Sequence, residues 1–177
     1  ALSQAEIPWE SVCITLVDER WVAVDDPDAN ERLVREHLLC NRACAARFIG
    51  LKSSAPDAAA GLRESTERFT RVPLPLSCVV LGMGADGHTA SWFPQASNLH
   101  ELLDPSGSAP LGWCDPVTAP HQRITLTLPV VLAAEEIILH ITGEEKRAVL
   151  ANAARESLPI AAVSAQDRNP VSIWWAP

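Results

Sequence analysis

Short apolar runs rich in β-branched residues alternate along the chain with segments of helical periodicity. The run VCITLV, from Val12 to Val17, is almost continuously apolar, which is typical of a strand that is covered on both faces. The run SCVVL, from Ser77 to Leu81, has the same character and leads into a glycine-rich turn. Three later segments are also predicted as strands: Arg123 to Leu128, Ile137 to Thr142, and Val171 to Trp175.

Three segments between these runs are predicted as helices. The first begins near Asp28 with Glu31 three residues later, an aspartate version of the capping box. The second runs from Asp57 through Phe69 and the third from Glu144 to Ala154. Residues 95 to 122 carry four prolines and no clear period, so we predict a long irregular connection there.

The alternation of strands and helices indicates an α/β layered fold with a mainly parallel sheet. With 177 residues the chain is long enough to enclose a substantial core, and we predict a single domain over residues 1 to 177. Apolar residues make up 47% and charged residues 20%, which is the composition of a folded protein and excludes disorder as the dominant state.

The charge balance narrows the class of partner. The 14 Lys and Arg against 22 Asp and Glu give a net charge of −8, a field that repels nucleic acids. A small phosphorylated ligand is compatible with this charge, because a few local cations and backbone amides can outweigh it at one site. We therefore expect a small-molecule ligand and no nucleic-acid partner.

The five cysteines are odd in number and have no framework spacing, so we expect reduced thiols and a cytoplasmic location. The first residues, ALSQAEIP, have no basic region followed by an apolar one, and no apolar run approaches bilayer length. We expect no signal peptide in this sequence and no membrane partner. His37, Cys40 and Cys44 share one predicted helical face, but a fourth ligand is not evident, so we expect no metal site.

Ligands of parallel sheets bind beyond the carboxyl ends of the strands, so the residues that follow each strand are the candidates for a site. Three such exits stand out: Asp18 to Arg20, Gly82 to Ser91, and Thr142 to Lys146. We expect these three segments to meet at one edge of the sheet.

The second exit contains a G-x-G-x-x-G pattern at Gly82, Gly84 and Gly87. A dinucleotide site needs an uninterrupted helix and a second strand after this pattern, whereas Pro94 cuts the helix early and a proline-rich loop follows. The glycines instead indicate a sharp turn with amides open toward a ligand. Gly84 and Gly87 are therefore predicted to bind substrate or phosphate.

His88 is the candidate general base, because imidazole titrates near neutral pH and this histidine lies on the glycine turn at a strand exit. The alternative is a helix-start histidine bonded to a neighbouring carboxylate. Asp86 either orients the imidazole or closes the turn. Thr89 and Ser91 are interpreted as helix-start caps, with ligand hydroxyls as the alternative.

Four segments, LVDERWVAVDDPDAN, GMGADGHTASWFP, RITLTLP and TGEEKRAVL, in this order and with these separations resemble the 6-phosphogluconolactonase family. The resemblance extends from about Val12 to Trp175. It implies a three-layer α/β/α fold shared with glucosamine-6-phosphate deaminases and ribose-5-phosphate isomerases. It also implies hydrolysis of 6-phosphoglucono-δ-lactone to 6-phosphogluconate in the pentose phosphate pathway, with no metal or organic cofactor.

The resemblance further implies roles for three cations. Arg20 is placed in the active site as a catalytic residue, where its guanidinium would hold phosphate or the carbonyl oxygen, and the alternative is a salt bridge to Asp18 or Asp25. Arg123 and Lys146 match phosphate-binding positions of related sugar-phosphate enzymes. For Lys146 the competing interpretation is a solvated pair with the two glutamates that precede it.

Two other functions stay open. The motif of the deaminases is similar to DGHIAFNEP and has a glutamate five residues after the histidine, where this chain has Phe93, so a needed carboxylate is absent. A non-catalytic sugar-phosphate binding module is the second alternative. Family members begin with a strand-helix-strand unit that carries a Ser-Gly-Gly-Ser/Thr-type phosphate loop, and we expect such a unit upstream of Ala1 in a fuller native protein. We expect that protein to be a monomer or a weak homo-oligomer.

Overall fold

Strands and helices alternate along most of the chain in the computed structural model, which describes all 177 residues. The strands are β1 (Cys13–Thr15), β2 (Asp18–Arg20), β3 (Arg47–Ile49), β4 (Cys78–Leu81), β5 (Leu111–Cys114), β6 (Arg123–Leu126), β7 (Glu136–Thr142) and β8 (Val171–Ala176). The α-helices are α1 (Asn30–His37), α2 (Ala58–Phe69), α3 (Leu99–Leu102), α4 (Leu128–Leu132), α5 (Glu144–Asn152) and α6 (Ala161–Ser164). Three short 3₁₀ helices are η1 (Leu2–Gln4), η2 (Trp9–Ser11) and η3 (Asn41–Ala45).

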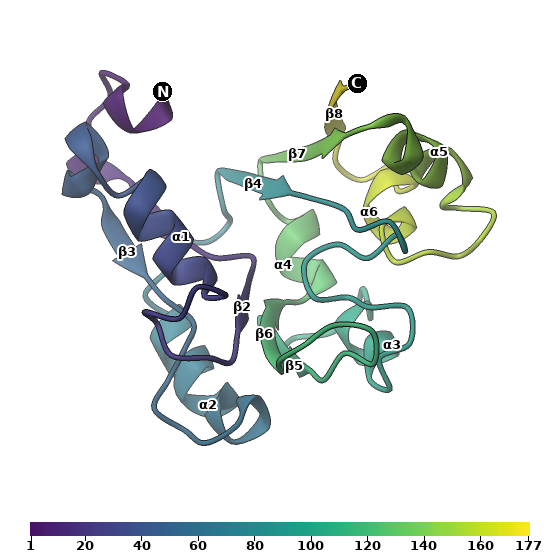
Figure 1. Ribbon diagram of the computed structural model, residues 1–177, viewed down its shortest axis with the longest axis horizontal. Coiled ribbons are helices and arrows are strands. Elements are labelled where there is room, and N and C mark those ends of the chain that lie inside the picture. Colours follow the sequence, from purple (N-terminus) through teal and green to yellow (C-terminus); the bar gives the residue numbers. More distant parts are fainter.

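The strands pair in three small sheets. Strands β4, β7 and β8 form a parallel sheet with β7 in the middle, and β1 pairs with β3, also in parallel. Strand β6 lies between β2 and β5 and is antiparallel to both. Figure 1 shows the N-terminal elements on one side, the β4–β7–β8 sheet with α5 and α6 on the other, and β2 beside β6 between them. The predicted α/β class with mainly parallel pairing is confirmed, and the antiparallel sheet was not foreseen.

The segment predicted as one strand from Val12 to Val17 is interrupted after Thr15. The chain then forms β2 from Asp18–Arg20, which the sequence analysis treated as the loop beyond the strand. Its backbone pairs with β6, so that Asp18 lies opposite Thr125 and Arg20 opposite Arg123. The prediction missed β2 because three consecutive charged residues carry no apolar alternation, and only the distant partner strand makes them extended.

Helix α1 begins at Asn30, and no side chain of the predicted capping box caps it. The carboxylate of Glu19, on β2, accepts hydrogen bonds from the backbone N–H groups of Asn30 and Glu31, both at 2.7 Å. Glu31 instead pairs with Arg35 one turn later. Burial raises the pKa of Glu19, and hydrogen bonds from the amides of Glu31, Asn30 and Arg20 oppose that rise. A capping group 11 residues before the start of its helix cannot be recognised by local spacing.

The segment from 95 to 122, predicted to be irregular, contains α3 and β5. Strand β5 pairs with β6, and Cys114 lies opposite Arg123. Strand β6 ends at Leu126, two residues earlier than predicted, because helix α4 begins at Leu128. Helix α4 has a proline in its first turn. The prolines therefore mark the ends of elements here and not one long loop.

Other predictions are confirmed. The side chain of Asp57 caps α2 by accepting a hydrogen bond from the Ala60 amide at 2.8 Å. Strands β4, β7 and β8 lie within one residue of their predicted bounds at nearly every end, and α5 starts at Glu144 as predicted and ends at Asn152. Strand β3 was not predicted, because it has only three residues.

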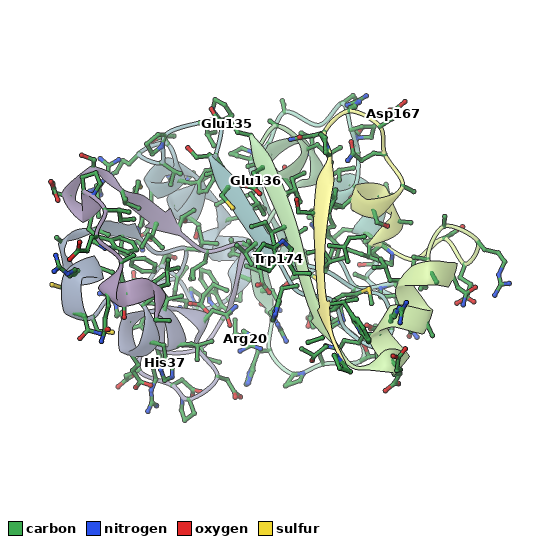
Figure 2. The ribbon with its side chains drawn as sticks, turned by 90° about the horizontal axis from the view of Figure 1, so that it is seen from above. Arg20, His37, Glu135, Glu136, Asp167 and Trp174 are labelled. Carbon is green, nitrogen blue, oxygen red and sulfur yellow. The ribbon has the colours of Figure 1, made fainter.

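A cluster of 26 buried apolar residues joins the three sheets, with members such as Ile49 of β3, Ile124 of β6 and Leu139 of β7. This core covers one face of the β4–β7–β8 sheet, and the opposite face is exposed to solvent. Figure 2 shows these three strands, with Trp174 of β8 labelled. Trp174 is 62% exposed and Val80 58%. No helix in the structure is both long and apolar enough to cross a bilayer.

Candidate functional site

One cavity of about 400 Å³ opens where the three predicted strand exits meet. Strand β2, the start of α1, the end of β4 with its following loop, the start of β6 and the first turn of α5 each contribute to its wall. The lining residues are Val17, Asp18, Arg20, Asn30, Val80, Leu81, Gly82, Met83, Gly84, His88, Thr89, Ala90, Arg123 and Lys146. Segments that are far apart in the sequence therefore form one polar, largely cationic site.

The loop after β4 is a tight turn that closes on itself. The Gly84 amide donates to the His88 carbonyl at 2.9 Å, and the Gly87 amide donates to the Gly84 carbonyl at 3.1 Å. Gly87 has φ +76°, and a Cβ there would lie 2.7 Å from the Leu158 side chain. Gly84 lines the cavity, whereas Gly87 does not. Gly87 thus shapes the turn, and its predicted contact with substrate is not supported by its position.

His88 forms a hydrogen bond through Nδ1 to Asp86 Oδ1 at 2.6 Å. Partial burial by itself would raise the pKa of Asp86, but hydrogen bonds from the His88 ring and amide outweigh it and hold that pKa below its usual value. An ionised carboxylate only accepts hydrogen bonds, so the proton of neutral His88 lies on Nδ1 and Nε2 carries a free lone pair. Asp86 both orients the imidazole and closes the turn, since it also accepts from the His88 amide.

The ring of Phe93 stacks on the imidazole ring of His88. The centroids of His88 and Phe93 are 4.3 Å apart, with 26° between the planes. The guanidinium carbon of Arg123 lies 5.4 Å from the same Phe93 ring centroid. The candidate base and a candidate phosphate ligand therefore share one aromatic support.

Arg123 is 7% exposed and is held by polar groups on several sides. Its Nη2 donates to the Pro120 carbonyl at 3.1 Å, and its Nη1 lies 3.7 Å from Asp18 Oδ2. Burial lowers the pKa of Arg123, with the charge of Asp18 opposing and that of Arg20 adding to the effect. The side chain is thus fixed at the cavity wall with part of its charge already balanced.

Asp18 connects three elements at this wall. Its Oδ2 accepts a hydrogen bond from Ser91 Oγ at 2.6 Å, and its Oδ1 accepts from Asn30 Nδ2 at 3.2 Å. Both Asp18 and Asn30 line the cavity. Asp18 belongs to one of the three predicted strand exits but was given no role, and Asn30 was not predicted at the site. The signal that could have identified Asn30 is its position at the start of the next helix.

The guanidinium group of Arg20 makes one hydrogen bond to the protein, and another of its nitrogens has no hydrogen-bond partner. Its Nη1 donates to the Asp28 carbonyl at 2.6 Å, whereas Nε is buried and has no hydrogen-bond partner. The alternative salt bridge to Asp18 or Asp25 is not formed. Arg20 also lines the cavity, and its Nη2 makes no hydrogen bond to the protein, so this end of the guanidinium suits a ligand oxygen.

Lys146 contributes a second unpaired cation from the first turn of α5. The solvated pair with the preceding glutamates is not formed by Lys146, because Glu144 pairs with Arg147 instead, at 3.6 Å. Gly143, with φ +85°, turns the chain from β7 into this helix. The ammonium group is therefore available to an anion in the cavity.

Thr89 and Ser91 are not helix caps, because no helix begins after the glycine turn. Thr89 Oγ1 donates to the Gly82 carbonyl at 2.7 Å, and Ser91 Oγ donates to Asp18 as described above. Between them Ala90 has φ +50°, an unfavourable backbone conformation for a residue with a Cβ. The strained residue lies in the cavity wall, where such conformations are most often found.

The side chains that line the cavity do not form the usual ligand set of a metal ion. No three or more His, Cys, Asp or Glu side chains are gathered as a metal site. All five cysteines are free thiols, and Cys114 is buried in the core, where desolvation raises its pKa to about 11. The polar side chains of the cavity are three cations, one carboxylate, one imidazole, one amide and one hydroxyl, which suit an anionic organic ligand.

Gly84 offers a test of how closely the turn supports the base. A Cβ at Gly84 would collide with the His88 ring and lie 2.6 Å from Asp86 Oδ1. We expect Gly84→Ala to fold but to lower the turnover of the protein's substrate at least tenfold, because the pair of side chains must move. In Gly82→Ala, whose added Cβ has nothing within 4 Å, the loss should be much smaller. Steady-state kinetics of both variants check this, and equal losses would contradict it.

Comparison with known proteins gives a consistent result. The family model described as glucosamine-6-phosphate isomerases/6-phosphogluconolactonase matches residues 1–174. The 6-phosphogluconolactonase of Mesorhizobium japonicum is 42% identical over 100% of this chain and 75% of its own length, and that of Pseudomonas aeruginosa is 41% identical with the same coverage.

Solved structures agree with these relatives. A crystal structure of a 6-phosphogluconolactonase from Shewanella baltica superposes with a TM-score of 0.95 at 46% identity, covering 99% of this chain and 76% of that one. A monomeric glucosamine-6-phosphate deaminase is only 16% identical but has a TM-score of 0.69, which shows a common fold.

Proposed function

This chain belongs to the family of glucosamine-6-phosphate isomerases and 6-phosphogluconolactonases, and we propose that it acts as a lactonase, hydrolysing 6-phosphoglucono-δ-lactone to 6-phosphogluconate in the pentose phosphate pathway. The observation that carries this proposal is the cavity in which a carboxylate-bound imidazole faces the same space as Arg20, Arg123 and Lys146. Lactone hydrolysis requires a base for water, donors for an oxyanion and a grip on the phosphate.

The proposed base is Nε2 of His88. It takes a proton from a water molecule while the water oxygen forms a bond to the lactone carbonyl carbon. The bond between that carbon and the ring oxygen then breaks, and the ring oxygen takes the proton from the imidazolium to become a hydroxyl group. Asp86 holds Nδ1–H throughout and stabilises the imidazolium that forms between the two steps.

Arg20 is proposed to stabilise the negative charge that develops on the carbonyl oxygen. Its guanidinium lines the cavity and uses only Nη1 for a hydrogen bond to the protein, so the donors of Nη2 are left for the oxyanion. Preorganised donors of this kind act most strongly where charge appears in the transition state. The bond from Nη1 to the Asp28 carbonyl keeps the guanidinium in place and does not use Nη2.

Arg123 and Lys146 are proposed to bind the phosphate group, since both line the same cavity as the base. A guanidinium fork and an ammonium point charge together suit a phosphate dianion. Lactone hydrolysis involves no oxidation or reduction. In this proposal the side chains of the cavity supply the base, the oxyanion donor and the phosphate contacts that the reaction needs.

The deaminase alternative finds no support at Phe93. The side chain there is a buried phenyl ring stacked on His88, and it brings no carboxylate to the base. The binding-module alternative predicts that the protein retains ligand without turnover, and kinetics separate it from the proposed enzyme.

The test is the release of acid from 6-phosphoglucono-δ-lactone at neutral pH. We expect the protein to hydrolyse the lactone well above the spontaneous rate, since a positioned base alone contributes roughly a hundredfold. Heat-denatured protein provides the background. A protein that binds 6-phosphogluconate by calorimetry but leaves the rate at background is a binding module, and the proposed reaction would then be wrong.

We propose a cytoplasmic location for this reaction. Five free thiols without a disulfide fit a reducing compartment, and Cys44 and Cys78 are exposed, where an oxidising environment would attack them first.

A further inference from the structure

Phe93 touches two groups of the site without reaching the cavity itself. It is 2% exposed and does not line the cavity, so it cannot contact a ligand there. Its ring is stacked on His88 with centroids 4.3 Å apart, and the guanidinium of Arg123 lies 5.4 Å from the same ring centroid. One buried side chain therefore supports both the proposed base and one of the proposed phosphate ligands.

The segment that carries Phe93 is firmly attached to β6. The Ser91 amide donates to Thr125 Oγ1 at 3.2 Å, and Trp92 Nε1 donates to the Leu126 carbonyl at 2.9 Å. Ser91 and Trp92 are both fully buried. Arg123 is the first residue of the same strand, so the ring has a fixed position relative to Arg123 as well.

The hydrogen bond to Asp86 selects the orientation of the His88 ring but does not define it fully. A hydrogen bond tolerates a range of angles, so the ring plane can still tilt about its mean position, which changes where the Nε2 lone pair points. Stacking against a fixed aromatic face removes that freedom. Arg123, whose charge lies near the same ring, gains a cation–π contact that holds its guanidinium in place.

We propose that Phe93 is a positioning residue for lactone hydrolysis: its ring sets the plane of the His88 imidazole and aligns it with Arg123, so that the base and the bound phosphate keep one geometry. This inference rests on the proposed function, in which His88 acts on the lactone and Arg123 holds its phosphate. Phe93 acts through these two side chains and never touches the substrate.

The first experiment compares Phe93→Leu with Phe69→Leu. Phe69 is 1% exposed in the same core at the end of α2, and it does not line the cavity, so both variants lose a similar buried ring. We expect kcat to fall about ten- to hundredfold in Phe93→Leu, the scale of a misplaced catalytic group, with a smaller rise in KM. In Phe69→Leu kcat should stay within about twofold of wild type although the melting temperature falls. Equal effects on kcat would overturn the proposal.

A double-mutant cycle with His88→Asn shows whether Phe93 acts through the base. If it does, adding Phe93→Leu to His88→Asn costs less than about threefold in kcat, because there is no imidazole left to orient. If the two losses multiply, the ring contributes only to general stability and the proposal is wrong. Phe93→Met, which refills the apolar space without a ring face, replaces Phe93→Leu in the cycle if the leucine variant does not fold.

A measurement without turnover separates this inference from the proposed function. In histidine-labelled protein, the ring signals of His88, assigned by their loss in His88→Asn, should carry a ring-current shift in wild type and in Phe69→Leu. Phe93→Leu and Phe93→Met should both lose this shift. A wild-type protein that shows the shift but does not hydrolyse the lactone would overturn the proposed function and leave the stacked geometry intact. A wild-type spectrum without the shift would overturn the positioning role.

Discussion

Replacing His88 with Asn lowers kcat for 6-phosphoglucono-δ-lactone by about a hundredfold or more and leaves most of the affinity for 6-phosphogluconate in place. The amide side chain fills the position of the imidazole but cannot take a proton from water, and loss of a general base has this magnitude. The three cations that contact the ligand in our proposal are unchanged in the variant. Initial rates of acid release and calorimetric binding of the product measure the two effects.

His100→Asn is the matched control for this variant. His100 lies in α3, its side chain is 79% exposed, and it does not line the cavity. Its replacement should leave both the rate and the binding as in wild type. Undiminished turnover in His88→Asn would remove His88 as the base, and the water would then have to be activated by another group of the cavity.

The second large effect concerns Lys146, which should distinguish phosphorylated from unphosphorylated lactones. In Lys146→Ala we expect kcat/KM for 6-phosphoglucono-δ-lactone to fall about ten- to hundredfold, since a charge-assisted hydrogen bond to phosphate is worth on the order of 1.5 to 3 kcal/mol. Hydrolysis of unphosphorylated glucono-δ-lactone should be almost unchanged. Part of the loss will appear in kcat, because remote binding energy also aligns the ring.

Arg147→Ala is the control for the loss of a neighbouring positive charge. Arg147 follows Lys146 on α5 but is directed to Glu144 and the Trp175 ring, away from the cavity. It should show no preference between the two lactones. If Lys146→Ala affected both substrates equally, or neither, Lys146 would not be a phosphate ligand, and the proposed orientation of the sugar would be wrong.

Lys146 is a cleaner probe of the phosphate than Arg123. Arg123 is 7% exposed and lies 3.7 Å from Asp18, so its removal would leave a carboxylate with less compensation as well as removing a ligand contact. The cation–π contact with Phe93 would be lost too. Lys146 has no such partners, and its replacement reports on the ligand alone.

Local patterns in the sequence were sufficient where one residue and its near neighbours decide the structure. Asp57 caps α2 through an amide three residues away, and the apolar run of β4 followed by three glycines predicted both the strand and the turn. The expectation that residues after the strands form the site holds for Arg20, His88 and Lys146, which all line the cavity. Arg123, which the family resemblance indicated, lines it from the first residue of β6.

Local patterns failed where the partner is distant in the sequence. Glu19 caps a helix that begins 11 residues later, and β5 exists because β6 lies beside it. The predicted capping box and the predicted irregular segment were both wrong for this reason. Backbone groups must find hydrogen-bond partners, and the chain can satisfy them with residues that no local window contains.

The order of residues was enough to predict the α/β class, the glycine turn that carries His88 and the family to which the chain belongs. Which side chains are held and which are free depends on how the elements pack together. Asp18 bonds Ser91 across 73 residues, Asp86 and Phe93 hold the two sides of one imidazole, and Arg20 keeps a buried nitrogen without a partner. Those differences arise from desolvation and from directional hydrogen bonds between packed elements, and neither can be evaluated until the elements are in place.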